Sequence, residues 1–410
     1  MKKLLLVLLI LSLFINHLNA NEKDLQIIQK DKKEYRLLEK ESIQTRQQSQ
    51  KYDWISPIDL SGNIGRNHSF SDENSRNLNN KNTKSASIGF TQSIFESGGI
   101  GFKMEYADNR FKYEMLSWEN QNSQLIYTIY NTLLDIKKLK LEINQNEYRI
   151  VNKDIELIIK KIQYEAGKTD IIELNNAIMS KNLIQKEEIA LKNSLKEKEQ
   201  ELAKYTDLKY DEIEILDFQE TNKDIFLDKN YSILEADAKV EMLNSEYKIK
   251  KSQYLPKLSL SAKASYSNQD EKFNSMINDT NKDDATSSGS LILSMPLYDY
   301  TKSSKIQESK IEVLKQKALL NDLKNETAFE YEQIFTKIDT YLKQNETINK
   351  NIKLYEELIG ANQISSEAGM TSKYDLEILE NTKTINEFDI LINKINILQQ
   401  YAKLYFKIKN

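Results

Sequence analysis

Residues 164–169 read Tyr-Glu-Ala-Gly-Lys-Thr, and residues 366–371 read Ser-Glu-Ala-Gly-Met-Thr. The glycines of these two stretches lie 202 positions apart (369 − 167). A second pair recurs at nearly the same offset, since Gln-Ser-Ile-Phe-Glu at 92–96 corresponds to Met-Pro-Leu-Tyr-Asp at 295–299. One structural unit that occurs twice in the chain explains both pairs better than chance does.

The amino-terminal segment has the pattern of an export signal. Two lysines precede an apolar run of about 12 residues, and Asn19-Ala20 offers a plausible cleavage site. Because a membrane-spanning helix needs about 20 apolar residues, this run favours cleavage over anchoring. We therefore assign residues 1–20 to a signal peptide, residues 21–228 to the first structural repeat and residues 229–410 to the second.

Each repeat contains two segments in which apolar and polar residues alternate. In the second repeat, for example, Leu258, Leu260 and Ala262 alternate with Ser259 and Ser261. This period of two predicts strands with one apolar and one polar face. The predicted strands cover about 56–71, 85–96, 256–267 and 288–298, and the polar stretches Ser71–Lys84 and Ser267–Ser288 are predicted to be hairpin tips.

The alternation by itself fits a soluble sandwich as well as a membrane sheet. Strand length favours the membrane, because a tilted membrane strand needs about 9–11 residues, and aromatic residues gather where an interfacial girdle would lie. Four strands cannot close a barrel, for which about eight are needed. Every unpaired backbone group at an open sheet edge is costly in lipid, so several chains are expected to share one barrel.

Very long helices are predicted between the strand pairs. Only 10 Gly and 3 Pro interrupt the whole chain, and these residues break helices most strongly. A helix of about 60 residues rises by roughly 90 Å. Gly167 and Gly369 are each expected to end such a helix and to reverse the chain. The predicted helices cover about 22–52, 102–163, 171–205, 231–254, 304–365 and 374–406, with an irregular stretch at 206–228.

Side chains along these helices follow the spacing of coiled-coil seams. In the first repeat Val151, Ile155, Ile158 and Ile162 recur at intervals of four, three and four residues. In the second repeat a heptad spacing runs through Ile378, Ile385, Phe388, Ile392 and Ile395. Each repeat is therefore predicted to form a helical coiled-coil hairpin.

The composition excludes several classes of function. The chain has no Cys and only two His, one of them in the predicted signal peptide, so Cys- or His-based catalysis and metal binding are not expected. The formal net charge of -4 argues against a nucleic-acid binder. The sequence contains no nucleophile-elbow, P-loop or zinc-protease motif. We therefore expect no enzyme activity, no cofactor and no metal ion.

The order of these segments resembles a known family. The run Ser-Gln-Tyr-Leu-Pro-Lys-Leu-Ser-Leu-Ser-Ala at 252–262 resembles the helix-to-strand entry of the TolC-like outer membrane efflux protein family. Residues 295–299 resemble its strand-to-helix exit, and residues 92–96 do so with Ser93 in place of the usual Pro. The segments around Gly167 and Gly369 resemble the paired periplasmic tip turns at the closed end of the family's tunnel.

The resemblance implies a mainly α protein with a membrane β-barrel. Each chain would contribute four strands to the twelve-stranded barrel of a homotrimer, and the duplicated coiled-coil helices would form an α-helical tunnel across the periplasm. The implied location is the outer membrane, in contact with its lipid. The implied function is the passive exit duct of a tripartite efflux pump or a type I secretion system. The implied partners are a periplasmic adaptor and an inner-membrane transporter of the RND or ABC type.

Two other functions compete with this one. One is a periplasmic adaptor built from a long helical hairpin and a small β-domain, and the other is a structural coiled-coil protein of the cell envelope. The duplication argues against the adaptor, because its strands would not form two similar hairpins that each precede a helix of about 60 residues. The four alternating strands and the signal peptide argue against the structural protein. The exported substrate and the type of transporter are not evident from the sequence.

The resemblance also points to functional residues near the two glycine turns. Glu173 and Asp375 match the acidic position at the narrowed tunnel entrance of the family, where three like charges would repel one another and attract cations. Alternatively, both are solvated first-turn acids placed favourably at a helix amino end. Exposed residues of the turns are expected to contact the partners, namely Lys168, Thr169, Met370 and Thr371.

Overall fold

The computed structural model describes residues 25–70, 78–214, 216, 218, 220–272, 279–367 and 372–409. The chain forms two compact units. The helical unit takes in Met1–Lys40, Leu116–Glu235 and Asn321–Asn410, and the sheet unit takes in Glu41–Met115 and Ala236–Leu320. Each unit draws on both halves of the duplicated sequence, so a compact unit of the structure is not the same as a sequence repeat.

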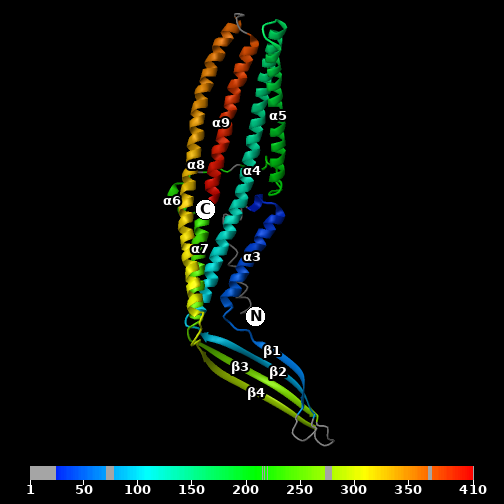
Figure 1. The fold of residues 1–410 in the computed structure, drawn as a ribbon, viewed down its shortest axis with the longest axis vertical. Coiled ribbons are helices and arrows are strands. Elements are labelled where there is room, and N and C mark those ends of the chain that lie inside the picture. Colours follow the sequence, from blue (N-terminus) through cyan, green and yellow to red (C-terminus); the bar gives the residue numbers. More distant parts are fainter. Residues whose placement is uncertain are drawn as a thin grey trace, which may run out of the picture. The chain divides into compact units, whose positions relative to one another are not determined.

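The sheet unit contains four antiparallel strands in the order β1-β2-β3-β4 (Figure 1). Each strand pairs with its neighbours in the sequence, so the hairpins of the two repeats lie side by side in one sheet. The strands are β1 Asp59–Phe70, β2 Leu78–Phe95, β3 Lys257–Lys272 and β4 Asp279–Ser294.

The strands extend further toward the hairpin tips than the alternation predicts. β2 begins at residue 78 rather than near 85, β3 ends at 272 rather than near 267, and β4 begins at 279 rather than near 288. The tips assigned to Ser71–Lys84 and Ser267–Ser288 were thus too long. Ladder hydrogen bonds use backbone groups, so polar segments can continue a strand without apolar side chains.

Leucines and alanines cover one face of the sheet, which we call the apolar face. The register pairs Leu258 with Leu293 and Leu260 with Leu291 on this face. Leu291 is 67% exposed and Leu293 is 73% exposed, so the described chain does not cover them. Along β3 the face runs from Leu258 to Tyr266, which corresponds to about 30 Å of strand. Tilted strands of that length produce the apolar band of roughly 25 Å seen on membrane barrels.

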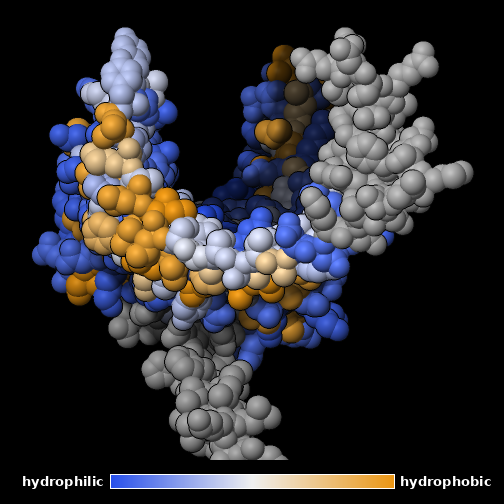
Figure 2. Space-filling model, turned by 90° about the horizontal axis from the view of Figure 1, so that it is seen from below, coloured by the Kyte–Doolittle hydropathy of each residue, from blue (hydrophilic) through white to orange (hydrophobic). Residues whose placement is uncertain are grey.

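The opposite face is lined by serine and threonine, and we call it the hydroxyl face. Its side chains form hydrogen bonds across neighbouring strands: Ser61 with Ser87 at 2.8 Å, Thr91 with Ser261 at 3.1 Å, Ser93 with Ser259 at 3.4 Å and Ser265 with Thr286 at 2.7 Å. In the view of Figure 2, hydrophobic side chains gather in a band and hydrophilic side chains flank it. The sheet is therefore amphipathic across its thickness.

Most helices begin and end within three residues of the predicted positions. They are α4 Gly99–Glu165, α5 Ile171–Leu202, α7 Tyr231–Ser252, α8 Lys302–Glu367 and α9 Lys373–Lys407. The predicted helix at 22–52 is shorter, because a 3₁₀ turn at Leu25–Ile27 precedes α3 Lys30–Tyr52. The stretch 206–228, predicted to be irregular, contains the short helix α6 Lys223–Asp228.

The helix α6 is fixed by one cap and one buried ring. The Asn222 side chain accepts a hydrogen bond from the Ile225 backbone N–H at 2.8 Å, which satisfies a free donor of the first turn. Phe226 is fully buried in a cluster with Ile334, Ile338, Leu404 and Ile408. This contact ties the segment before α7 to α8 and α9 within the helical unit.

In the helical unit, α3 is attached to α4 through Arg36. The guanidinium donates hydrogen bonds to Oδ1 of Asn122 at 2.6 Å and to the carbonyl oxygen of Trp118 at 2.9 Å. The Trp118 indole N–H donates to the Arg36 carbonyl oxygen at 2.8 Å. Burial lowers the pKa of the Arg36 guanidinium, and the nearby Glu39 carboxylate opposes that effect. These bonds give the buried guanidinium and the indole N–H hydrogen-bond partners.

Across the described ranges, no helix combines the length and the apolar character that crossing a membrane requires. In the same part of the chain, no three His, Cys, Asp or Glu side chains are grouped so that they could hold a metal ion.

Candidate functional site

The turn between α4 and α5 is a Schellman motif built on Gly167. Its φ is +66°, in the left-handed region that glycine adopts without a steric penalty. The Gly167 N–H donates to the carbonyl oxygen of Tyr164 at 2.9 Å, and the Lys168 N–H donates to that of Gln163 at 2.8 Å. These two bonds satisfy carbonyl groups at the end of α4 and reverse the chain, as the sequence predicts for this glycine.

We expect Gly167→Ala to destabilise the α4–α5 hairpin by about 1 kcal/mol, because the added methyl group is strained at positive φ. Gly360→Ala is the matched control: Gly360 lies inside α8, and a Cβ there would have no neighbour within 4 Å. That control should stabilise its helix by roughly 0.5–1 kcal/mol. Urea unfolding followed by circular dichroism measures both, and equal effects of the two variants would contradict the role of Gly167.

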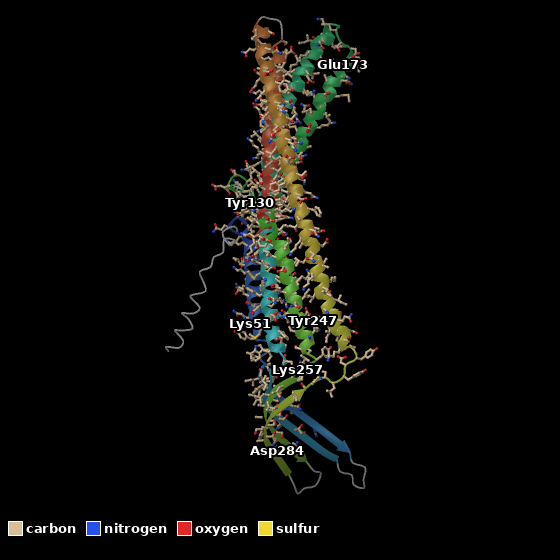
Figure 3. All side chains as sticks on the ribbon, turned by 90° about the vertical axis from the view of Figure 1, so that its left-hand side faces the viewer. Lys51, Tyr130, Glu173, Tyr247, Lys257 and Asp284 are labelled. Carbon is tan, nitrogen blue, oxygen red and sulfur yellow. The ribbon has the colours of Figure 1, made fainter. Side chains whose placement is uncertain are left out.

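The predicted gate residue Glu173 lies in the first turn of α5, at the end of the α4–α5 hairpin (Figure 3). Its backbone N–H donates to Oδ1 of Asp170, the N-cap residue, at 2.9 Å. Its carboxylate forms an ion pair with Nζ of Lys160 on α4 at 3.1 Å. The side chain is still 51% exposed, so it remains accessible to ions and to other proteins.

The other predicted site residues lie at the ends of the two hairpins. Lys168 is exposed and Thr169 is half-buried in the first turn. Asp375 is exposed in the first turn of α9, where the Ser372 hydroxyl accepts the Tyr374 N–H at 3.2 Å and caps the helix. The predicted turn residue Gly369 and the predicted contact residues Met370 and Thr371 lie outside the described residues.

A polar seam joins the two hairpins, and the sequence analysis missed it. Gln145 Nε2 of α4 donates to Oδ1 of Asp389 on α9 at 2.7 Å. Seven residues later on α4 and seven residues earlier on α9, Asn152 Nδ2 donates to Oγ1 of Thr382 at 3.3 Å. Asn381 adds a donor to Oδ1 of Asn152 at 2.9 Å. The seven-residue spacing of the partners was the available signal, but only apolar residues were counted in the predicted seams.

The apolar seam of the first repeat is only partly buried. Ile155 is buried, whereas Val151, Ile158 and Ile162 are exposed in the described chain. Exposed apolar side chains at coiled-coil spacing leave α4 and α5 with a surface that other helices can cover.

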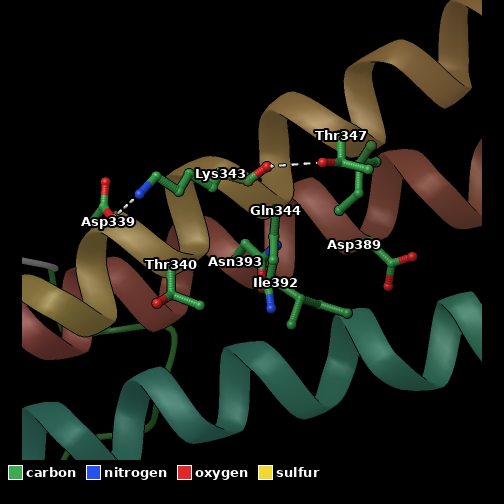
Figure 4. Close-up of a pocket in the computed structure, with 9 residues that line it drawn as sticks. Asp339, Thr340, Lys343, Gln344, Thr347, Asp389, Ile392 and Asn393 are labelled. Atoms are coloured by element: carbon green, nitrogen blue, oxygen red, sulfur yellow. Dashed lines mark hydrogen bonds and ion pairs between the residues drawn. The ribbon is translucent and has the colours of Figure 1, made fainter.

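A depression of about 570 Å³ lies between α8 and α9 (Figure 4). Its ion pair, Lys343 with Asp339 at 2.6 Å, is formed by residues four apart on α8. Nearby, Nδ2 of Asn393 on α9 donates to Oδ1 of Asn345 on α8 at 2.9 Å. The depression is thus a polar surface groove whose contacts hold two neighbouring helices together, and its charged pair has the geometry of an ordinary solvated helix face.

Comparison with known proteins gives a family-model match over part of the chain and a fold. Residues 224–403 match the family model described as outer membrane efflux protein. Among curated proteins, none matches the sequence. The structure is similar to the outer-membrane channel OprN, with a TM-score of 0.70 and 10% identity over 91% of this chain and 86% of that chain.

Two further solved structures are similar to this chain. VceC from Vibrio cholerae has a TM-score of 0.69 and 13% identity, with coverage of 93% of this chain and 94% of that chain. CmeC from Campylobacter jejuni has a TM-score of 0.67 and 12% identity, with coverage of 92% and 84%. The chain has the fold of the TolC-like outer membrane efflux proteins. The predicted family resemblance and fold class are confirmed.

The TolC-like family is one of outer-membrane channels and not of enzymes. The family match and the fold together support the predicted function, a channel-tunnel subunit of an efflux system, and the predicted location in the outer membrane with extension into the periplasm. The roles of Glu173, Asp375 and the turn residues remain predictions.

Proposed function

We propose that three copies of this chain form one outer-membrane channel, which serves as the passive exit duct of a tripartite efflux pump or a type I secretion system. The amphipathic four-stranded sheet carries this proposal. In the described sheet β1 and β4 each pair with one strand only, so each keeps one open edge. In lipid those edges must be paired, and pairing β4 of one copy with β1 of the next closes a barrel.

The two faces of the sheet assign the inside and the outside of such a barrel. The apolar face would meet lipid, because its leucines are exposed at membrane-strand spacing. The hydroxyl face would line a water-filled passage, where serine and threonine can hydrogen-bond to solvent. Three chains of four strands would give twelve strands, above the practical minimum of about eight.

The helical hairpins would form an α-helical tunnel across the periplasm. We propose that their ends meet a periplasmic adaptor and an inner-membrane transporter of the RND or ABC type. The proposed contact residues are those of the two turns, Lys168, Thr169, Met370 and Thr371. The first two lie at the end of the α4–α5 hairpin, where they are accessible at least in part.

The assembly can be tested by crosslinking, because the chain contains no Cys. One cysteine placed in β1 and one in β4 should produce disulfide-linked oligomers up to the trimer in outer-membrane fractions. Two cysteines placed within β1 alone should not. The purified protein should also form channels in planar lipid bilayers. A water-soluble monomer that forms no channels would contradict the proposed function.

Glu173→Ala combined with Asp375→Ala should change the single-channel conductance and reduce cation selectivity in planar bilayers, because a ring of carboxylates at a constriction concentrates cations. Glu197→Ala combined with Asp322→Ala is the matched control, since both residues are exposed helix acids away from the turns. The control should leave conductance unchanged. If the gate variant behaves like the control, Glu173 and Asp375 act only as first-turn helix acids.

A further inference from the structure

The hydroxyl face carries a depression of about 410 Å³ with a glycine at its floor. Asp59 of β1 pairs with Gly89 of β2, and Gly89 pairs with Lys263 of β3, so these residues form one row across the sheet. Neighbouring strands lie about 4.8 Å apart, which places the α-carbons of Asp59 and Lys263 about 10 Å apart. Gly89 has no side chain, so no side chain of β2 lies between Asp59 and Lys263 in this row.

The packing of the strands favours glycine at position 89. A Cβ on Gly89 would lie 3.0 Å from the Ala262 carbonyl oxygen and 3.3 Å from both Cα and Cβ of Lys263. At these distances a Cβ would require its neighbours on β3 to shift by a few tenths of an ångström. The sheet therefore keeps the floor of the depression open.

The two charges on either side of the floor are available to a ligand. Asp59 and Lys263 are both exposed, and neither has an ion-pair partner within the described part of the chain. Ser56 and four further hydroxyl residues line the same depression, and these four are Ser61, Ser87, Thr91 and Ser261. The last four already form two hydrogen-bonded pairs, and each of their hydroxyl oxygens can accept a further bond.

We propose that the depression formed by Asp59, Gly89 and Lys263 binds a small zwitterion, with the ligand's ammonium group at Asp59 and its carboxylate at Lys263. A simple anion or cation would satisfy only one of the two charges. An extended dipeptide spans about 7 Å, which is shorter than the distance of about 10 Å between the α-carbons of Asp59 and Lys263. The inference rests on the proposed function, because solutes meet the hydroxyl face when it lines the channel.

The probe is glycylglycine, and its control is the same dipeptide with both ends capped and uncharged. In planar bilayers, glycylglycine should reduce the open-channel current of the wild-type protein, and the capped dipeptide should not. Lys263→Ser and Asp59→Asn should each raise the concentration for half-maximal block by about tenfold, because a charge-assisted hydrogen bond is lost. Lys84→Ser is the matched control. Lys84 pairs with Ile64 and lies on the face of the sheet opposite to the depression, so its replacement should leave block by glycylglycine unchanged.

Binding is also measured directly on the detergent-solubilised protein by saturation-transfer NMR, with the same probes and variants. If no channels form but the wild-type protein binds glycylglycine in a Lys263-dependent manner, the channel proposal fails and the site stands. If channels form and glycylglycine neither binds to the protein nor blocks the current, the proposed zwitterion site is contradicted. Equal block by the capped dipeptide, or unchanged block in Lys263→Ser, would also overturn the zwitterion site.

Discussion

Replacing Leu291 by Arg is expected to remove most of the protein from the outer-membrane fraction. Leu291 lies on the apolar face of β4, 67% exposed and paired with Leu260. An arginine at a lipid-facing barrel position costs about 2–4 kcal/mol near the bilayer centre. In the proposed trimer every barrel would contain three such residues, so the cost is incurred three times. Membrane fractionation followed by detergent extraction of folded oligomer measures the loss.

Ser290→Arg provides the matched control for this prediction. Ser290 is the neighbouring residue of the same strand, and it points to the opposite face, where it pairs with Ser261. The same charge placed there would face water and should leave insertion largely intact. Equal losses in the two variants would show that the face of the sheet does not matter, and the assignment of the apolar face to lipid would then be wrong.

Phe226→Ala is expected to destabilise the helical unit by about 3–5 kcal/mol, the usual cost of removing a fully buried aromatic ring. Phe226 is 0% exposed, and its ring contacts Tyr331 at a centroid distance of 5.5 Å. Ile334 and Leu404 belong to the same buried cluster and would lose contacts with the ring. The midpoint of urea unfolding, followed by far-ultraviolet circular dichroism, measures the change.

The neighbouring residue supplies the control. Ile225 lies in the same short helix and is 44% exposed. Ile225→Ala keeps the backbone N–H that Asn222 caps, so it should cost well under half as much as Phe226→Ala. If the two variants unfold at the same urea concentration, α6 does not attach the connecting segment to α8 and α9, and the cluster around Phe226 contributes little stability.

Much of the fold could be predicted because its signals are local. Long runs without Gly or Pro predict α4 and α8, and Gly167 predicts a turn, since few other residues adopt a positive φ without strain. Alternation predicts the apolar part of each strand, where side-chain pattern and backbone pairing coincide. These features depend on neighbours in the sequence and not on the rest of the molecule.

Other features of the fold depend on partners far away in the chain, and they leave no clear pattern in the sequence. The polar ends of β3 and β4 pair because their backbones continue a ladder, which no side-chain alternation records. The helix α6 has six residues, too few to display a helical period. The polar seam of Gln145 and Asn152 needs partners more than 200 positions away. The gate residues were predicted from family resemblance, and a single chain does not display the constriction that three copies would form.

The way the two units divide the sequence has a consequence for biogenesis. Each unit combines segments from both halves of the chain, with the last segment of the helical unit at Asn321–Asn410. During export the amino-terminal half emerges first. It contains only part of each unit. Neither unit can therefore be completed before the carboxy-terminal half is available, and surfaces of the first half that are covered in the complete units stay uncovered until then.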